Sequence, residues 1–389
     1  MTALNDTERD RLSASNLSWQ AFAKDEVEPC AQDIDRNAHI PADLIQRLRD
    51  LGAFTHGFSE QFGGPQGSTK DPVLAAQIQG GMHEALGYAS AAVQGMVNVH
   101  HMGGSALARW GSKAQKAHWV PLMTSGQAIA AIAITEPNVG SQTSAVETWA
   151  TPVPGGFKIK GTKAWITCGQ SADIFVLITG SDQGPTAFIL PKDIKGLTIE
   201  PIDNMLGCRG YMMAKLHLDD CFLPDENLLG PPGFGASHVA TTGLESGRYN
   251  LAWGCVGLAQ GCLDASLTYA KKRSQFGEPI ANFQLIQQKI ARMMTDIHAS
   301  RLMCQNAGMK RGQKHPSATL EVTMAKYFAS QTANRSAFDA VQIHGAQGCG
   351  PEYPIERYYR DARIMEIIEG TSEILETVIA RLGYQEHTI

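Results

Sequence analysis

The feature that most constrains the fold of this chain is a change in residue pattern that occurs twice along its 389 residues. Apolar residues recur at helical spacing up to about residue 127. From residue 128 to 236, short β-branched and aromatic runs separated by Gly, Pro and Asp predict strands. Beyond the turn-rich segment Gly230–Gly235, the helical period returns. The sequence therefore predicts an α+β protein with a helical domain (1–127), a small antiparallel β domain (128–236) and a helical bundle (237–389).

Individual elements follow from the same patterns. In the first domain, a helix should begin near Pro41, present Leu44, Leu48 and Leu51 on one face and end at Gly52; a turn should follow at Phe62–Pro65. The expected strands are Phe157–Trp165, Ile174–Ile178, Thr186–Leu190 and Leu216–Leu218. In the bundle, the apolar stripes are Leu251, Cys255, Leu258, Cys262, Ala265 and Tyr269; Ile286, Ile290, Met293 and Ile297; and Leu320, Met324, Tyr327, Gln331, Phe338 and Val341.

Composition excludes several classes of function. The formal net charge of −5 gives no general attraction to nucleic acid or to an anionic membrane, and no segment has the 18 or so consecutive apolar residues of a membrane span. Since the N-terminus lacks the pattern of a secretory signal, a cytoplasmic location is expected. The eight cysteines show no zinc spacing and are expected to be reduced, and His100 and His101 are read as structural rather than as metal ligands.

Several short motifs could carry chemistry, and each also has a plain structural reading. Thr135–Ser141 is a loop that presents hydroxyls and N–H groups, or simply a connection into the β domain. In Trp165-Ile166-Thr167, strand alternation places an indole beside a hydroxyl. This pair could contact a planar aromatic ligand, or Trp165 could simply be a buried core residue. Arg273–Gly277 could hold a pyrophosphate or be a solvated helix end. Gln342–Gly348 allows close backbone approach, but it is no GxGxxG fingerprint after a strand, so a Rossmann fold is not supported.

Three carboxylates near the C-terminus are spaced as if they shared a helix face. Glu366, Glu369 and Glu373 stand at i, i+3 and i+7, but Gly370–Ser372 interrupts the helix. Thr371 or Ser372 is expected to cap a new helix that has Glu373 in its first turn and Gly383 after its end. Glu369 is then left in the preceding loop, where its side chain can face a site.

Taken together, the motifs resemble the acyl-CoA dehydrogenase family. The FGG turn, the TEP and GS loop, WIT, LESGR, RSQFG, QIHGAQG and EGTSEI occur in that order over nearly the whole chain. The resemblance implies three domains (α-helical, β-barrel-like and four-helix bundle), bound FAD, a homotetramer and reoxidation by an electron-transfer flavoprotein. It also implies that Glu369 is the catalytic base, since the other position used in the family is occupied here by Gly247.

The resemblance assigns the remaining site residues by position. Residues expected near the flavin ring are Ile132, Ala133, Ile134, Thr135, Ser141, Trp165 and Thr167, with Thr371 and Glu373 closing the site. The pyrophosphate and adenosine contacts are expected from Arg273, Phe276, Gln284, Gln342, Gly345 and Ala346, some of them reaching the FAD of a neighbouring subunit. The acyl thioester is expected to contact Ser141, Glu245, Arg248 and Gly370. The helix expected to form the floor of the acyl pocket carries the polar residues Gln94 and Asn98, which favours a short or polar acyl group.

The sequence leaves the substrate and the electron acceptor open. The phrases Thr135–Asn138, Arg248-Tyr249 and Ala252–Gly254 look like the glutaryl-CoA dehydrogenase branch, yet the position of that branch's carboxylate-binding Arg is Ala89. The thioester could be an acyl-CoA or an acyl group on a carrier protein. A flavin oxidase or monooxygenase on the same fold is the rival function, and Glu369 favours the dehydrogenase.

Overall fold

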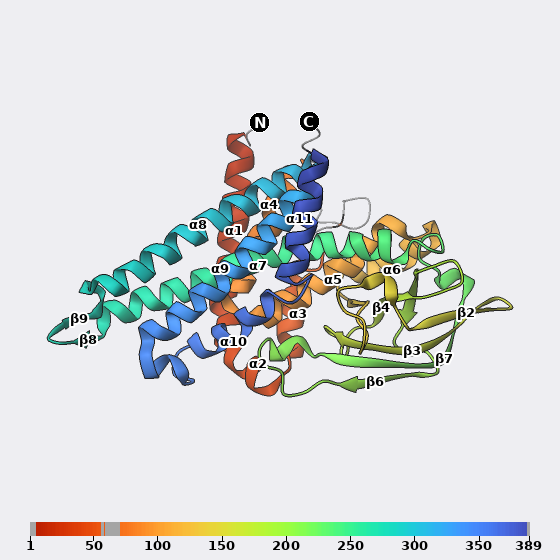
Figure 1. Ribbon diagram of the computed structural model, residues 1–389, viewed down its shortest axis with the longest axis horizontal. Helices are drawn as coiled ribbons and strands as arrows, with labels where there is room; N and C mark the ends of the chain where they lie inside the picture. The colour runs from red at the N-terminus through yellow and green to blue at the C-terminus, as the bar shows by residue number, and fades with distance from the viewer. Residues whose placement is uncertain (1–4, 56–57, 59–70, 387–389) are drawn as a thin grey trace.

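The computed structural model describes residues 5–55, 58 and 71–386, and the expected turn at Phe62–Pro65 lies outside them. Figure 1 shows a β domain at one end of the molecule and long helices at the other, with the N-terminal helices between them. This is the helical, β and helical order that the sequence predicts. None of the described helices has the length and apolarity needed to cross a membrane, and the described residues contain no His, Cys, Asp and Glu cluster that could hold a metal ion.

The N-terminal region is built around two buried helices. α4 and α5 are rich in Gly and Ala, which lets them pack closely against α7 of the C-terminal region; Gly257 of α7 lies so near α4 that a Cβ there would meet the Glu84 carbonyl oxygen at 1.9 Å. Leu44 and Leu48 are buried as predicted, whereas Leu51 is 42% exposed. The helices are α1 (Asp6–Phe22), α2 (Ala31–Asn37), α3 (Ala42–Asp50), α4 (Pro72–Ala89), α5 (Ala91–Trp110) and α6 (Lys113–Thr124).

The middle region forms two sheets, one with the strand order β1-β4-β5 and one with the order β2-β3-β7-β6. All pairs are antiparallel except β1 and β4, so the prediction of a wholly antiparallel domain was wrong at this pair. Apolar runs do not encode strand direction, which explains the error. The strands are β1 (Ala130–Ala133), β2 (Trp149–Val153), β3 (Gly156–Ile166), β4 (Ile174–Thr179), β5 (Thr186–Pro191), β6 (Leu197–Pro201) and β7 (Ala214–Pro224).

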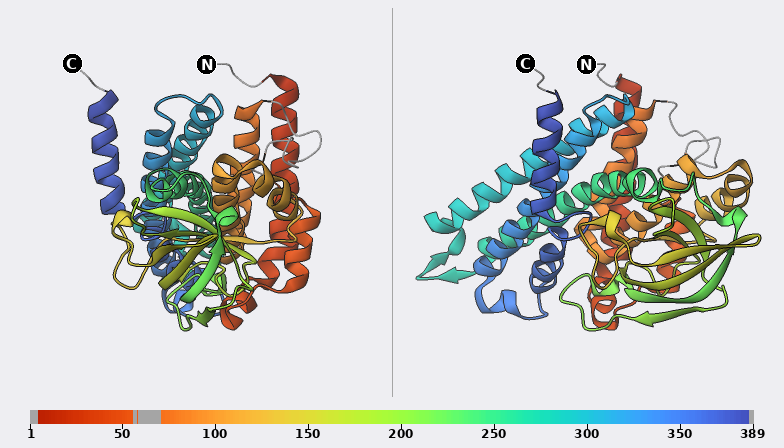
Figure 2. Two further views of the ribbon diagram at one scale, coloured as in Figure 1. Left: turned by 90° about the vertical axis from the view of Figure 1, so that its right-hand side faces the viewer. Right: turned by 45° about the vertical axis from the view of Figure 1, so that its right-hand side comes forward.

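The C-terminal region contains three long helices that run side by side, flanked by two shorter ones (Figure 1). The helices are α7 (Thr241–Lys272), α8 (Gln284–Gly312), α9 (Ala318–His344), α10 (Ile355–Met365) and α11 (Ser372–Glu386); β8 (Ser274–Gln275) and β9 (Glu278–Pro279) form a hairpin between α7 and α8. Gly383 lies inside α11, so its predicted place after the helix was wrong. In the second view of Figure 2, α11 stands upright between the hairpin at one end of the molecule and the β domain at the other.

The first two predicted stripes of the bundle are largely correct, but the third is not. Phe338 is 57% exposed and its stripe-mates are not in the core. The face of α9 that is buried carries small residues, because α9 packs closely on α7 and large side chains would not fit between the two axes. These buried residues are Val322, Ala325, Ala329, Ala333, Ala337 and Ala340.

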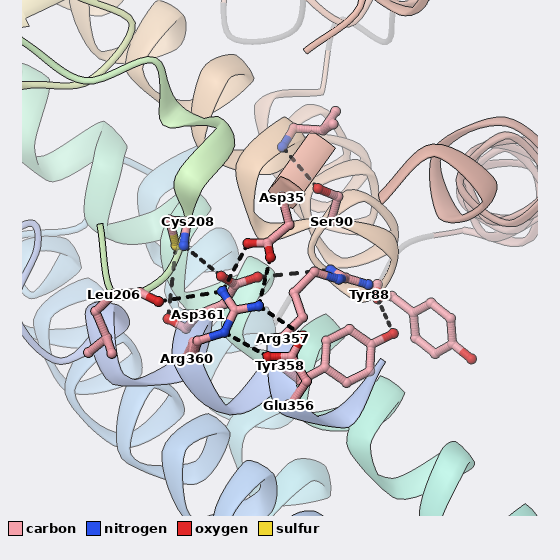
Figure 3. Close-up of polar contacts among 11 residues, drawn as sticks. Asp35, Tyr88, Ser90, Leu206, Cys208, Glu356, Arg357, Tyr358, Arg360 and Asp361 are labelled. Atoms are coloured by element: carbon pink, nitrogen blue, oxygen red, sulfur yellow. Dashed lines mark hydrogen bonds and ion pairs between the residues drawn. The ribbon is translucent and has the colours of Figure 1, made fainter. Parts of the chain in front are cut away.

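A buried ionic cluster joins the three regions (Figure 3). Arg360 of α10 donates to Asp35 of α2 at 2.6 Å and to Glu356 at 2.7 Å. The next residue, Asp361, accepts the Cys208 N–H at 2.6 Å from the loop before β7. Because Asp35 and Cys208 belong to the other two regions, the cluster fixes α10, and with it the segment that follows α10, relative to those regions.

Candidate active site

The site centres on the tight turn that joins α10 to α11. The turn is closed by the Ser372 N–H, which donates to the Glu366 carbonyl oxygen at 3.1 Å, and the Thr371 hydroxyl accepts the Ile374 N–H at 3.4 Å. Thr371, one of the two residues predicted for this role, therefore caps α11. Glu369 and Gly370 have φ values of 57° and 100°. A left-handed glutamate is strained, and such strain persists only where surrounding contacts fix the backbone.

The Glu369 carboxyl group points into the protein against α5 and α7. Its Oε2 atom is buried and has no hydrogen-bond partner in the described structure. A Cβ at position 247 would lie 2.7 Å from this oxygen and 2.8 Å from Met102 Sδ. The carboxylate thus fills the space that a side chain at position 247 would need.

Burial raises the pKa of Glu369 to about 7, although the nearby Arg248 and Lys326 act to lower it. A carboxylate with a pKa near neutrality is a stronger base than an ordinary one and is still ionised in part at neutral pH. The site can therefore remove a proton from a weakly acidic carbon placed beside Glu369.

Two predicted thioester contacts hold the turn itself. Arg248 Nε donates to the Glu369 carbonyl oxygen at 2.9 Å, and a Cβ at position 370 would lie 3.4 Å from Arg248 Nη2. Glu245 stands one turn earlier on α7 and is half-buried. Their contact with a substrate stays a prediction, but the structure brings Arg248 and Gly370 together at the Glu369 turn.

The predicted flavin residues gather where β1 and β3 end. Ile132, Ala133 and Ile134 are buried, and the Thr135 carbonyl oxygen accepts the Ala164 N–H at 2.9 Å. Lys163 and Glu136 form an ion pair at 2.7 Å with both side chains buried, and Lys163 also donates to the Ile134 carbonyl oxygen at 2.9 Å. This pair fixes the loop that carries the predicted flavin contacts. Sequence analysis missed it, although a lysine at an inward position of a strand is a signal for such a pair.

Trp165 differs from the expectation of simple alternation. Its φ of 59° interrupts the strand, the register with β7 shifts between Lys163 and Ile166, and the indole is 57% exposed. The Thr167 hydroxyl reaches only Met213 Sδ, at 3.9 Å, and Ser141 is exposed on the loop beyond β1. An exposed indole beside hydroxyls with spare hydrogen-bonding capacity is a donor set that fits the ring of a flavin.

The second set of predicted cofactor residues lies far from the first. All of its members are exposed, and Phe276 at the tip of the β8–β9 hairpin is 95% exposed. Figure 1 places the hairpin at the end of the bundle opposite the β domain. One copy of the chain therefore does not bring the two sets together. The residues of this distal set are Arg273, Phe276, Gln284, Gln342, Gly345 and Ala346.

The two polar residues predicted for the acyl pocket differ in their surroundings. Gln94 Nε2 is within hydrogen-bond distance of His83 Nδ1 and of the Asn250 carbonyl oxygen, each at 3.2 Å, so this buried amide nitrogen already has partners. Asn98 is 3% exposed, and its Oδ1 atom has no partner in the described structure. Asn98 stands one helical turn from Met102, whose Sδ lies 2.8 Å from the Cβ that a side chain at position 247 would carry. Of the two, Asn98 is the residue with hydrogen-bonding capacity left for a ligand.

Other predictions concern residues outside the site. The cysteines are all free thiols, six of them buried. His100 accepts the Ala130 N–H at 3.2 Å and burial lowers its pKa to about 4, while His101 lies 3.3 Å from His83 and 3.0 Å from the Ala53 carbonyl oxygen. These are structural roles for both histidines, as the sequence indicated.

Comparison with known proteins gives matches over the whole chain. Residues 14–127, 131–221 and 235–383 match the profiles described as the N-terminal, middle and C-terminal domains of acyl-CoA dehydrogenase. The chain is 38% identical to the probable acyl-CoA dehydrogenase YngJ of Bacillus subtilis, over 92% of this chain and 94% of that protein. It is 38% identical to the human mitochondrial short-chain specific acyl-CoA dehydrogenase, over 92% and 86%. Its fold is similar to a glutaryl-coenzyme A dehydrogenase in complex with glutaryl-CoA, with a TM-score of 0.91, 30% identity and coverage of 98% and 97%.

Proposed function

The chain belongs to the acyl-CoA dehydrogenase family, and we propose that it removes the α-proton of an acyl thioester with Glu369 while the β-hydride passes to FAD. The family assignment makes the protein an oxidoreductase that acts on CH–CH donors with FAD as cofactor. The observation that carries the proposal is the Glu369 carboxyl group, whose Oε2 atom is buried against Gly247 without a hydrogen-bond partner in the described structure and whose pKa is raised to about 7.

The chain's own residues prepare the thioester for proton loss. Arg248 holds the Glu369 carbonyl oxygen, which keeps the turn in its left-handed conformation and the carboxylate against Gly247. Proton loss from the α-carbon places negative charge on the thioester oxygen, and an N–H donor such as that of Glu369 would stabilise this charge. Burial of the Glu369 Oε2 atom and a bound substrate together would limit the access of water to the carboxylate.

The cofactor would be held by the residues at the ends of β1 and β3. The loop from Ile132 to Thr135 would flank the isoalloxazine ring, with Trp165 packed against it and the hydroxyls of Thr167 and Ser141 available to its heteroatoms. When bound, FAD supplies the hydride acceptor at N5. The distal set around Arg273 and Phe276 would bind the pyrophosphate and adenosine of the FAD in a second copy, as the homotetramer implied by the family resemblance requires.

The acyl group is proposed to be short or polar. Met102 Sδ and Glu369 Oε2 both lie near the position of a Cβ at residue 247, and Asn98, one turn from Met102 on α5, has a buried Oδ1 atom without a partner in the described structure. A polar group on the acyl chain could give this buried acceptor a hydrogen-bond partner, whereas a long alkyl chain would leave it without one, which costs free energy. Ala89, at the position of the carboxylate-binding Arg, is fully buried, and this disfavours a glutaryl substrate.

The deciding experiment is anaerobic reduction of the bound flavin by a panel of acyl-CoAs and carrier-bound acyl groups, with wild-type protein and Glu369→Gln. We expect four- to six-carbon acyl-CoAs to bleach the wild-type flavin and to leave that of the variant oxidised. Slow reoxidation in air and fast reoxidation by an electron-transfer flavoprotein would support the dehydrogenase, whereas fast reoxidation in air would indicate the oxidase. Unimpaired reduction of the variant flavin would show that Glu369 is not the base, and faster bleaching by long-chain acyl-CoAs would contradict the proposed acyl group.

A further inference from the structure

A second cation, besides Arg248, reaches the Glu369 turn from a helix that the mechanism has not used. Lys326 of α9 is fully buried, and its Nζ donates to the Gly370 carbonyl oxygen at 2.8 Å. Arg248 of α7 donates to the adjacent carbonyl oxygen, that of Glu369, at 2.9 Å. Two side chains from two different helices thus hold two successive carbonyl groups of the turn.

The burial of Lys326 needs an explanation, because an ammonium group is costly to remove from water unless it is paired. Its hydrogen bond goes to a neutral carbonyl oxygen, and the nearest helix-end carboxylate is already engaged: Glu366 accepts from Asn334 at 2.8 Å and from Arg363 at 2.9 Å. The remaining charged and titratable groups that act on Lys326 are Glu369 in the turn and Arg248 and Cys255 on α7. The two carboxylates that act on Lys326 are therefore Glu366 and Glu369. Of the two, Glu369 is the one with an oxygen, Oε2, that has no hydrogen-bond partner in the described structure.

We propose that Lys326 is a positioning residue for the catalytic base: it fixes the Gly370 carbonyl so that Glu369 stays left-handed, and its charge supports the ionised carboxylate from a distance. The inference rests on the proposed function of Glu369. The contacts of Lys326 support both its role in holding the backbone and its electrostatic role. The hydrogen bond restrains the backbone just after the strained residue, and the absence of a direct Lys326–Glu369 hydrogen bond leaves the carboxylate free to accept the substrate proton.

The electrostatic half predicts the direction of a pH effect. The positive charge of Lys326 lowers the pKa of Glu369, against the raising effect of burial. Loss of the charge would therefore raise the pKa of the base, and the rise of activity with pH would move to higher pH. Substitution of a residue that only filled space in the core would not change the pH at which activity rises.

The test compares holoenzyme variants of nearly matched shape. Lys326→Met removes the donor and the charge, Lys326→Arg keeps both, and Lys326→Gln keeps a donor without charge. Tyr327→Phe is the control, since Tyr327 also links α9 to α11, through Glu376 at 2.8 Å, without contacting the turn. We expect Lys326→Met to slow flavin reduction by about 10- to 100-fold, the size of effect that a misplaced catalytic group produces. We also expect its pH profile to shift to higher pH and its KM to stay within a few-fold of wild type.

Hydrogen exchange of the backbone amides in 366–375 provides a readout that does not depend on activity. Exchange should be faster in Lys326→Met than in wild type and unchanged in Tyr327→Phe. If Lys326→Met does not fold, Lys326→Gln tests the charge alone, by the same shift in pH profile. Unchanged rates, pH profile and exchange in the variant that folds would overturn the proposal. If no acyl thioester reduces the wild-type flavin, the proposed function fails, and the exchange measurement still decides whether Lys326 holds the turn.

Discussion

Substitution of Glu369 should change activity and stability in opposite directions. Burial raises the pKa of this carboxyl group from its ordinary value of 4.5 to about 7. Ionising it therefore costs about 3 kcal/mol more in the folded protein than in the unfolded chain, because each pH unit of difference in pKa is worth about 1.4 kcal/mol. Since the folded state retains the proton longer, the free energy of unfolding falls as the pH rises from 4.5 to 7, and the loss is complete above 7.

Glu369→Gln removes this titration. We expect the variant to exceed wild type in free energy of unfolding by about 1 kcal/mol at pH 5 and by about 3 kcal/mol at pH 8. At the same time, its flavin reduction by acyl-CoA should fall by about 10²- to 10⁴-fold, the usual contribution of a general base. The assay is chemical denaturation of both holoproteins between pH 5 and 8, with flavin reduction measured in parallel.

Glu366→Gln is the matched control for this experiment. Glu366 lies three residues earlier and has hydrogen-bond partners for both oxygens, Asn334 and Arg363, so its amide variant should be no more stable than wild type. A stability difference between Glu369→Gln and wild type that is the same at pH 5 and pH 8 would refute the raised pKa. A variant less stable than wild type at pH 8 would show that the ionised carboxylate has partners in the folded protein.

Two further substitutions test the parts of the site that position the flavin and the base. Lys163→Met removes the cation paired with the buried Glu136 carboxylate and should cost about 3–5 kcal/mol and much of the bound FAD, measured by denaturation and flavin content, whereas removal of the exposed Lys215–Glu200 ion pair should change the stability far less. Gly247→Ala places a Cβ within 2.7 Å of Glu369 Oε2 and should reduce the rate of flavin reduction by about 100-fold with FAD retained; a variant with wild-type rates would contradict the described position of the carboxylate.

Local patterns were enough to predict the order of the domains and the place of Glu369. Helical and strand periods differ over a few residues, and the Gly370–Ser372 break is visible in the sequence; α11 begins at Ser372 as expected. Strand direction and close packing were not predictable in this way. The parallel pairing of β1 with β4 and the alanine face of α9 depend on contacts between segments distant in sequence, and a search for large apolar residues selects the wrong face of a closely packed helix.

The contacts around Glu369 were inaccessible to sequence analysis for a related reason. Lys326 precedes Gly370 by 44 residues and meets it only because α9 packs alongside the turn. Nothing in the spacing of Lys326 distinguishes it from a lysine on a solvated helix face. The same holds for Met102 of α5, whose Sδ lies beside Gly247 on the side where the Glu369 carboxyl group lies. Motifs led to the prediction of which residues carry the chemistry, but the residues that contact the Glu369 turn come from other elements.

The two buried lysines of the site show how the atom that receives a hydrogen bond determines what a carboxylate can do. Lys163 donates directly to Glu136, and although burial alone would raise the pKa of Glu136, the hydrogen bonds from Lys163 and Thr148 lower it overall. A carboxylate held in this way stays ionised and serves the structure. Lys326 instead donates to the carbonyl oxygen of Gly370, so it positions the Glu369 carboxylate without a hydrogen bond to it. Burial can then raise the pKa of Glu369 to about 7. A direct ion pair at Glu369 would lower the pKa of the carboxyl group by about 1–3 units and weaken it as a base. The hydrogen bond from Lys326 to the neighbouring carbonyl oxygen restrains the turn without this effect, which suits the proposed role of Glu369 as a base near neutral pH.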